Sequence, residues 1–114
     1  MGPVSSVAQS GLKVESMRLA VSANNVANTL TNGFTPSTVV ASEAAGGGVT
    51  GEVFKPRDLA ADARTDGLAM AAASKTDLVS EVVTQSMSSA AFRANLASLK
   101  TDQENFDALI SIRR

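Results

Sequence analysis

The side chains of this sequence best suited to specific polar contacts are its amides, because the residues that most often perform catalysis are absent. The 114 residues include no Cys and no His, so thiol nucleophiles, imidazole bases, disulfides and the usual zinc ligands are all missing. A carboxylate pair or a Ser/Lys dyad remains possible, but the Asp and Glu residues are scattered and no GxSxG motif frames a serine. We therefore predict that the protein is not an enzyme and needs no cofactor or metal.

The amides gather in one stretch, SANNVANTLTNGF, which runs from Ser22 to Phe34. Its four asparagines are Asn24, Asn25, Asn28 and Asn32. Asparagine is a mediocre helix former, since its side chain competes for backbone hydrogen bonds. A buried asparagine between helices must find hydrogen-bond partners and thereby fixes the register of the pair. We predict that Asn24 and Asn28 lie on such a seam.

The element that must position these amides is a helix over about Ser5–Thr31. Ser5 or Ser6 is the predicted N-cap, and Asn32-Gly33 is a predicted left-handed stop. Steps of three and four residues define one seam, formed by Val7, Ser10, Val14, Met17, Val21, Asn24, Asn28 and Thr31. A second apolar stripe, nearly opposite, is formed by Leu12, Leu19 and Val26.

A helix that is apolar on two sides needs neighbours on both sides. Because the chain offers few other helices, we expect one neighbour to be another molecule; the central helix of a bundle is the alternative. No residue from Leu19 to Ser42 is charged, and such a surface is easily desolvated against protein.

Composition excludes several kinds of partner. Ten Lys and Arg residues against 11 Asp and Glu residues give a net charge of −1, which argues against nucleic acid and against a polybasic membrane patch. No apolar stretch of about 18 residues is present, so we expect no direct membrane insertion. The first residues lack the basic and apolar regions of a cleaved signal peptide, which by itself indicates the cytoplasm.

The middle of the chain, 34–74, is rich in Gly, Ser and Thr, with Pro36 and Pro56 as breaks. Val49–Phe54 is a candidate short strand. The glycines at 46–48 lack the GK[ST] of a phosphate loop, so we interpret them as a flexible linker or hinge. Residues 59–74 are ambiguous between a short helix and an extended linker.

The last segment predicts a long helix. Ser74 and Asp77 form a potential capping box before it. A periodic run follows, formed by Leu78, Val82, Gln85, Ser89, Phe92, Leu96, Leu99, Gln103, Phe106 and Ile110. Such a helix is a rod about 55 Å long, and Arg113 and Arg114 complement its dipole.

These segments predict an all-α fold in which two long terminal helices form an antiparallel, coiled-coil-like pair. An irregular middle segment, with room for a short β-hairpin, joins the two helices. The predicted divisions are 1–33, 34–74 and 75–114. With only four Phe and no Trp or Tyr, a deep core is not expected, and helices that meet along seams fit the composition better.

The stretch LAVSANNVANTLTNGF closely resembles the N-terminal signature of the bacterial flagellar rod, hook and hook-associated family, which commonly reads like NNIANVNTPGYK. The matching residues are Asn24, Asn25, Val26, Ala27, Asn28, Thr31, Gly33 and Phe34. Leu30 stands at a usual asparagine, Asn32 at a usual proline, and Phe34 at a usual tyrosine.

The other end of the chain is similar to the C-terminal helix of the same family. In DLVSEVVTQSMSSAAFRANLASLKT the matching residues are Leu78, Val79, Glu81, Val82, Ser89, Phe92, Ala94, Asn95 and Leu99. Ala91 stands where an arginine is common. The short middle segment is similar to that of the proximal-rod subunits, whereas hook and distal-rod proteins have large additional domains there.

The resemblance implies a structural subunit of the flagellar rod that polymerises through its terminal helices into a torque-transmitting shaft. Its implied partners are other copies of itself, other rod proteins and the flagellar type III export apparatus. The implied location is the basal body, in a rod that spans the periplasm, reached without a cleaved signal peptide. The alternative function is a cytoplasmic coiled-coil adaptor or an export-chaperone-like protein.

We expect the assembly interface to combine the asparagine-rich stretch with the seams of both helices. Its predicted residues are Val14, Met17, Val21, Asn24, Asn25, Asn28, Asn32, Gly33, Phe34, Leu78, Val82, Phe92, Asn95, Leu96, Leu99, Phe106 and Ile110.

Overall fold

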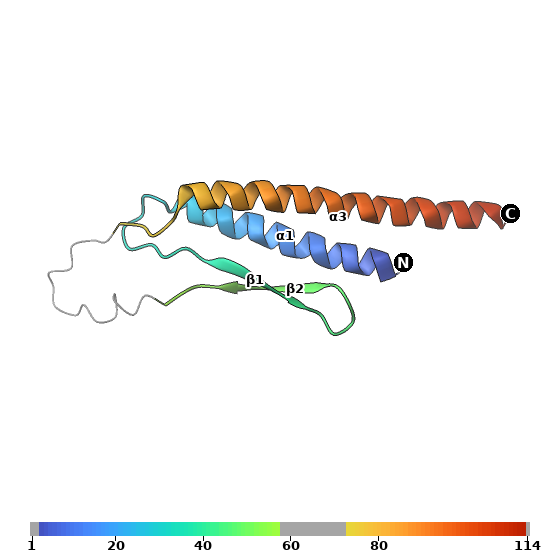
Figure 1. The fold of residues 1–114 in the computed structure, drawn as a ribbon, viewed down its shortest axis with the longest axis horizontal. Helices are drawn as coiled ribbons and strands as arrows, with labels where there is room; N and C mark the ends of the chain where they lie inside the picture. Colours follow the sequence, from blue (N-terminus) through green and yellow to red (C-terminus); the bar gives the residue numbers. More distant parts are fainter. Residues whose placement is uncertain (1–2, 58–72, 114) are drawn as a thin grey trace.

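Two long helices and one β-hairpin make up the computed structural model, which describes residues 3–57 and 73–113. In chain order the elements are α1 (Pro3–Ala27), β1 (Thr38–Glu43), β2 (Val49–Phe54) and α3 (Leu78–Ile112). The helices run antiparallel, so both chain ends lie at the same end of the molecule (Figure 1). The predicted pair of long terminal helices is confirmed. The predicted ambiguity over 59–74 falls mostly outside the described residues.

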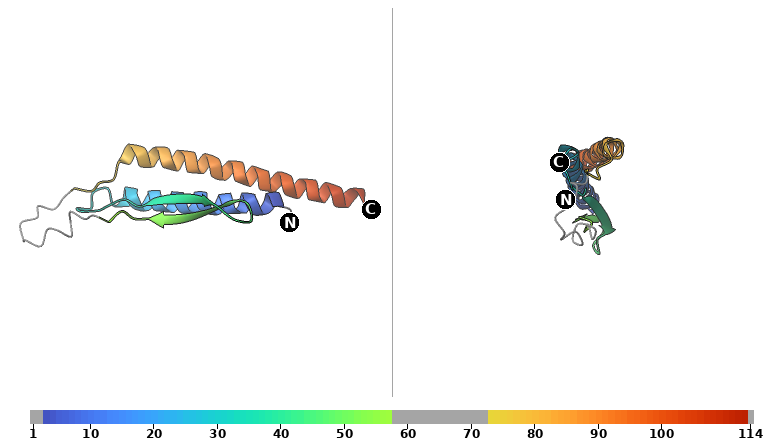
Figure 2. Two further views of the ribbon diagram at one scale, coloured as in Figure 1. Left: turned by 60° about the horizontal axis from the view of Figure 1, so that its bottom comes forward. Right: turned by 90° about the vertical axis from the view of Figure 1, so that its left-hand side faces the viewer.

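The three layers are ordered α3, α1, hairpin, with α1 in the middle (Figures 1 and 2). The molecule measures 77 × 27 × 14 Å, and its radius of gyration is 20.1 Å. A compact domain of this length would have a radius of gyration of about 13 Å. Among the described residues, only Ala8 and Val14 are buried apolar side chains. The fold is therefore a thin, elongated body with little core of its own.

Helix α1 ends earlier than predicted, at Ala27, because asparagine side chains terminate it. The amide of Asn28 donates from Nδ2 to the backbone oxygen of Asn24 at 2.9 Å, and its Oδ1 accepts from the Thr31 hydroxyl at 3.1 Å. Gly33 has a positive φ of 73°, but it lies beyond the end of α1 at Ala27. It therefore turns the chain after the helix and is not the predicted stop of the helix itself.

The predicted cap at the start of α1 is wrong. The helix begins at Pro3, where a proline suits the first turn because its missing N–H is not needed there. Ser5 therefore lies inside the helix, where it is buried and donates to the carboxylate of Asp102 on α3.

The middle segment contains a regular antiparallel hairpin. Its register runs from Thr38 opposite Phe54 to Glu43 opposite Val49, which confirms the predicted strand over Val49–Phe54. The glycines at 46–48 are not a hinge between helices: they form the hairpin turn, where Gly47 and Gly48 both have φ of 85°. The turn needs them because other residues rarely adopt that conformation.

The start of α3 differs from the predicted capping box. Asp77 is the N-cap, and its carboxylate accepts from the backbone N–H groups of Val79 and Ser80 at 3.0 and 3.4 Å. Ser74 instead bonds to Thr76 within the preceding extended segment. An aspartate at this position satisfies free N–H groups and also complements the positive end of the helix dipole.

This difference gives a first prediction about stability. Asp77→Ala should lower the free energy of unfolding by about 1 kcal/mol, which is typical for the loss of an N-cap. Ser74→Ala should change it by less than about 0.5 kcal/mol. Urea unfolding followed by circular dichroism measures both, and equal losses from the two variants would contradict the assignment of the cap.

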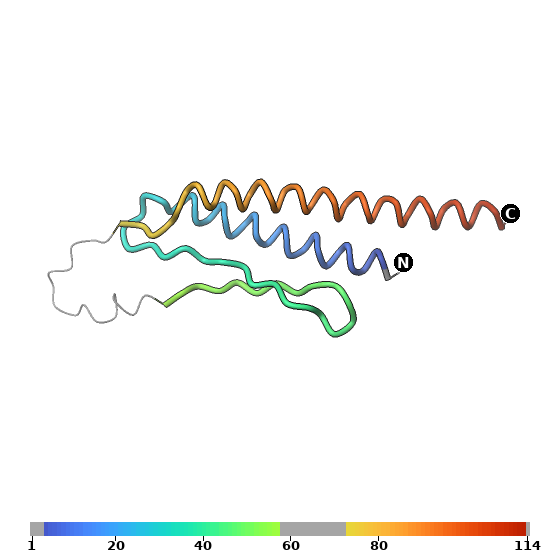
Figure 3. Tube along the Cα trace, in the orientation of Figure 1, coloured from blue at the N-terminus to red at the C-terminus, as the bar shows by residue number. Residues whose placement is uncertain are grey.

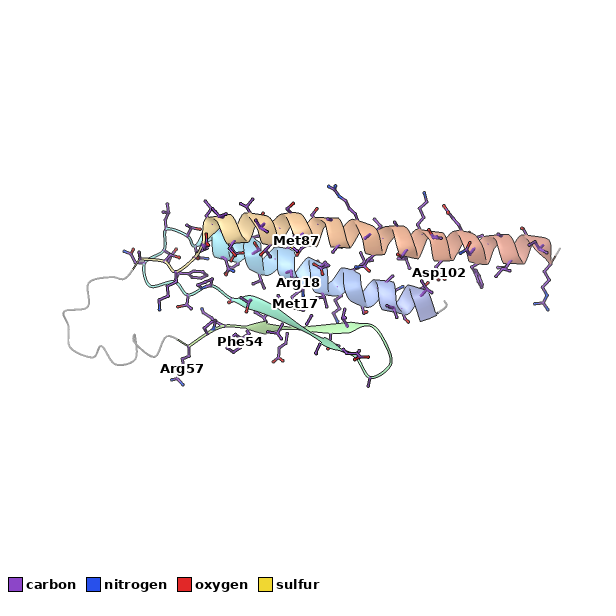
Figure 4. All side chains as sticks on the ribbon, in the orientation of Figure 1. Met17, Arg18, Phe54, Arg57, Met87 and Asp102 are labelled. Atoms are coloured by element: carbon purple, nitrogen blue, oxygen red, sulfur yellow. The ribbon has the colours of Figure 1, made fainter. Side chains whose placement is uncertain are left out.

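The hairpin supplies the second neighbour that α1 needs. Val14 is 3% exposed, and it lies with Met17 against Gly51 of β2. Figure 4 labels Met17. The hydroxyl of Ser10 accepts from the backbone N–H of Val49 at 3.0 Å. The predicted seam through Val7, Ser10, Val14 and Met17 thus faces the chain's own hairpin. We expected a helix to pack on this seam and one neighbour of α1 to be another molecule; on this side the neighbour is instead the hairpin of the same chain.

Candidate assembly interface

The contact between α1 and α3 is built from small and polar side chains. On α3 the contact residues recur every seven positions, as Glu81, Ser88, Asn95 and Asp102. On α1 the corresponding residues are Ser5, Ala8, Gly11, Glu15, Ser22 and Asn25. Small residues let the two backbones approach closely, and polar ones fix the register through hydrogen bonds.

The closest approach is between Gly11 and Asn95. A Cβ atom at position 11 would lie 2.7 Å from Asn95 Nδ2 and 2.9 Å from its Cγ. The amide of Asn95 therefore occupies the space that any larger residue at position 11 would need. This pairing sets how far α3 can slide along α1.

Asn25 is the central polar contact of the molecule. It is 2% exposed, and its Nδ2 donates to the backbone oxygen of Ser37 at 2.8 Å and to Glu81 Oε1 at 2.7 Å. Its Oδ1 accepts from the backbone N–H of Ser37 at 2.9 Å. One amide thus joins α1, the segment that leads into β1, and α3.

Neighbouring polar groups reinforce this contact. The hydroxyl of Ser22, which is 1% exposed, donates to the backbone oxygen of Glu81 at 3.2 Å. Glu15 is also buried, and its carboxylate pairs with Arg18 at 2.8 Å. No buried side-chain polar atom in the described part of the chain lacks a hydrogen-bond partner. A satisfied polar network of this kind specifies one arrangement of its elements.

The same end of the molecule is tied together at Phe34. Its backbone oxygen accepts from the N–H of Lys75 at 3.0 Å, just before α3. The ammonium of Lys55, just after β2, lies 5.7 Å from the centre of its ring, within reach of a cation–π interaction. Phe34 therefore holds together the chain segments that enter and leave the middle of the protein.

The predicted interface residues fall into three groups. Buried or half-buried within the chain are Val14, Met17, Val21, Asn25, Asn28, Phe34, Phe92, Asn95 and Leu99. Exposed near the end of α1 are Asn24, Asn32 and Gly33. Exposed along α3 are Leu78, Val82, Leu96, Phe106 and Ile110. The structure joins Asn25 to α3 and Asn95 to α1, whereas the residues of the third group stay about half exposed.

The amide that meets α3 is Asn25 rather than Asn24 or Asn28. The α3-facing positions of α1 are displaced by one residue from the predicted seam, because the hairpin occupies that seam. Gly11, Ser22 and Ser88 were not predicted as contact residues. The sequence feature that could have predicted this face of α1 is the repeat of small and polar residues every seven positions, at Ala8, Glu15 and Ser22.

Exposed apolar side chains continue along the outside of the molecule. On α3 they include Val79 at 73% exposure and Met87 at 68%, and on the hairpin Val40 and Phe54, each at 56%. No helix of the described residues has the length and hydropathy that a membrane span requires, and no group of acidic residues within these ranges is placed to hold a metal. Rows of apolar residues on a thin body are typical of surfaces that pack against other proteins.

The structure is an extended pair of helices with a hairpin, and its exposed apolar side chains are typical of surfaces that pack against other proteins. Residues 6–35 match the family model described as flagella basal body rod protein. The match covers most of α1 and the asparagine-rich turn after it, and it supports a flagellar rod-type structural role. No curated protein matches the chain.

Proposed function

We propose that this chain is a structural subunit of the proximal rod of the bacterial flagellar basal body, and that it polymerises through its terminal helices into the torque-transmitting shaft. The main support is that the match to the rod family falls on the helix whose Asn25 bonds both to α3 and to the segment that leads into β1. The thin body and its exposed apolar rows also favour a subunit whose core is completed by neighbours.

Within the rod we favour the position of the protein FlgC over that of its sister FlgB. The short middle segment and the sequence EAAGGGV are similar to those of FlgC. The partners on this proposal are other copies of the chain, other rod proteins and the flagellar type III export apparatus. On this proposal the chain is located in the rod, which spans the periplasm.

The polar contacts suit a shaft that must resist twisting. Directional hydrogen bonds at Asn25 hold α1, α3 and the entry to β1 in one arrangement, whereas apolar contacts alone tolerate sliding. Torque applied to one helix is then passed to the whole subunit. In this proposal the exposed residues of α3 transmit it to neighbouring subunits.

Leu96 tests the role of the exposed face of α3. It is 50% exposed, so Leu96→Asp should leave the fold of one subunit nearly intact while placing a charge in the desolvated contact between subunits. We expect cells with this variant to lose motility. Lys100→Asp is the matched control, because the side chain of Lys100 is 78% exposed. We expect it to leave motility nearly unchanged. Equal swimming of the two strains would contradict the role of this face.

Asn28 tests the proposed register role of the asparagine stretch between subunits. Leucine is a better helix former, so Asn28→Leu should keep or raise helicity, yet it removes the amide that we expect to select one register. We predict incomplete rods, seen as missing hooks and filaments at wild-type expression. Rods of normal length would show that Asn28 serves only the local turn with Asn24 and Thr31.

Deleting the gene in its source organism tests the function as a whole. We expect cells without hooks and filaments, restored by the wild-type chain supplied in trans. A cytoplasmic adaptor would differ in solution, because it would form a closed complex of fixed stoichiometry with one partner. A rod subunit should join open-ended assemblies. Sedimentation of the chain from lysates and from purified basal bodies separates these two outcomes.

A further inference from the structure

One dipeptide, Asn32-Gly33, lies in the turn after α1, at the end of the molecule opposite the start of α1 and the end of α3 (Figure 3). It is the only place in the sequence where glycine follows asparagine. The side-chain amide of an asparagine is within reach of the backbone nitrogen of the next residue, and a glycine has no side chain that hinders this nitrogen. The sequence therefore singles out Asn32 for a reaction with its own backbone.

The structure leaves the reacting groups of this pair free. Both residues are exposed, and no hydrogen bond within the described part of the chain involves the Asn32 side chain or the Gly33 N–H. The backbone bond from Phe34 N–H to the oxygen of Thr31, at 3.2 Å, closes the turn around the pair. No atom lies within 4 Å of the position that a Cβ atom of Gly33 would take. The pair can therefore reorient without breaking tertiary contacts.

The other asparagines are held in place. Asn25 is 2% exposed, and its amide makes three hydrogen bonds. Both polar atoms of the Asn28 amide are bonded, and the N–H of Thr29, which would have to attack it, donates to the oxygen of Val26 at 3.1 Å. The remaining asparagines lie inside α1 or α3, where the next N–H belongs to the helical hydrogen-bond ladder. Such groups react only after local unfolding.

We propose that Asn32 is a site of spontaneous deamidation, in which its amide is converted to a carboxylate. The backbone nitrogen of Gly33 gives its proton to water and attacks Cγ of Asn32. The new N–C bond closes a succinimide ring, the bond from Cγ to Nδ2 breaks, and this nitrogen takes up a proton and leaves as ammonia.

Water then opens the ring at either of its carbonyl carbons. Cleavage of the bond between the ring nitrogen and Cγ gives aspartate, whereas cleavage on the backbone side gives isoaspartate. Overall one water is consumed and one ammonia is released, so the reaction needs no oxidant, reductant or enzyme.

Either product changes this end of the molecule. The stretch from Leu19 to Ser42 contains no charged residue, so the new carboxylate is the first charge within it. Isoaspartate also adds a methylene group to the main chain just before Phe34, whose backbone oxygen accepts from the N–H of Lys75 at 3.0 Å. Deamidation thus alters both the charge and the backbone length of the turn that joins α1 to the hairpin.

Mass spectrometry of the purified, folded chain tests this reaction. Samples are kept in water labelled with heavy oxygen at neutral and mildly alkaline pH, and fragmentation of the peptides assigns the site and distinguishes aspartate from isoaspartate. We expect amide loss at Asn32 to be at least about tenfold faster than at Asn28, which must first open locally. The product should contain heavy oxygen, and the rate should rise with pH because the attacking nitrogen must lose its proton. Asn32→Gln is the matched control and should keep its amide, since the same attack would close a larger, less favourable ring.

A sample unfolded in urea separates the effect of the structure from that of the sequence. Unfolding should speed amide loss at Asn28 but change the rate at Asn32 by less than about threefold, because the folded turn does not protect Asn32. Equal rates at the two positions in the folded chain would overturn the proposal. So would an Asn32 that keeps its amide in the folded chain and loses it rapidly in urea. None of these outcomes depends on the proposed function.

Discussion

Asn25→Asp should lower the free energy of unfolding by about 3 kcal/mol at neutral pH, because it leaves a charged carboxylate among acceptors. The Nδ2 atom of Asn25 donates to Ser37 and to Glu81 Oε1 at 2.8 and 2.7 Å. A carboxylate oxygen there would face two acceptors, one of which is charged. The two side chains have nearly the same size, so no cavity contributes to the loss. Urea unfolding followed by circular dichroism provides the measurement.

Two comparisons make the result specific to this contact. Asn24→Asp, one residue earlier on the exposed side of α1, should cost less than about 1 kcal/mol. Glu81→Gln combined with Asn25→Asp restores a donor opposite the new carboxylate, so it should recover a large part of the loss. Equal losses at positions 24 and 25 would show that Asn25 does not hold α1 to α3 and to the segment before β1.

Gly11→Leu should destabilise the helix pair by about 2–3 kcal/mol, the typical cost of forcing atoms into a filled contact. The space that the leucine needs is occupied by Asn95, whose Nδ2 is 2.7 Å from the position of a Cβ atom. Gly46→Leu is the matched control, because no atom lies within 4 Å of its Cβ position. Thermal unfolding of both variants gives the comparison.

A smaller substitution separates crowding from helix propensity. Gly11→Ala gains about 1 kcal/mol of helix propensity but still meets Asn95. In the background of Asn95→Ala the crowding is gone, so the same change should become stabilising. If Gly11→Ala has the same effect in both backgrounds, the close approach does not determine how the two helices pack.

The helices could be predicted from the sequence because their signals are local. Periodic apolar residues marked α3, and Pro3 and Asp77 lie at helix ends where short-range chemistry selects them. The prediction failed only in choosing which of two neighbouring residues caps a helix: Ser74 was expected to begin the capping box of α3, whereas the N-cap is Asp77. Choosing between two nearby caps depends on backbone angles that the sequence does not reveal.

The seam of α1 could not be predicted so well, because it depends on a contact that is distant in sequence. The apolar stripe through Val14 seemed suited to a helix, but the hairpin strands pair across a turn and then cover that stripe. The competition between hairpin and helix for one face is decided by tertiary packing. As a result α3 takes the adjacent face, and the buried amide is Asn25.

Imaging of purified basal bodies with a tagged chain tests the central claim most directly. The hairpin turn is the place for the tag, because an added side chain at Gly46 meets no atom within 4 Å. We predict additional density along the rod, in cells that swim, at positions repeated by the symmetry of the shaft. Complete rods without this density, together with the tagged chain in a closed cytoplasmic complex, would contradict the role as a rod subunit.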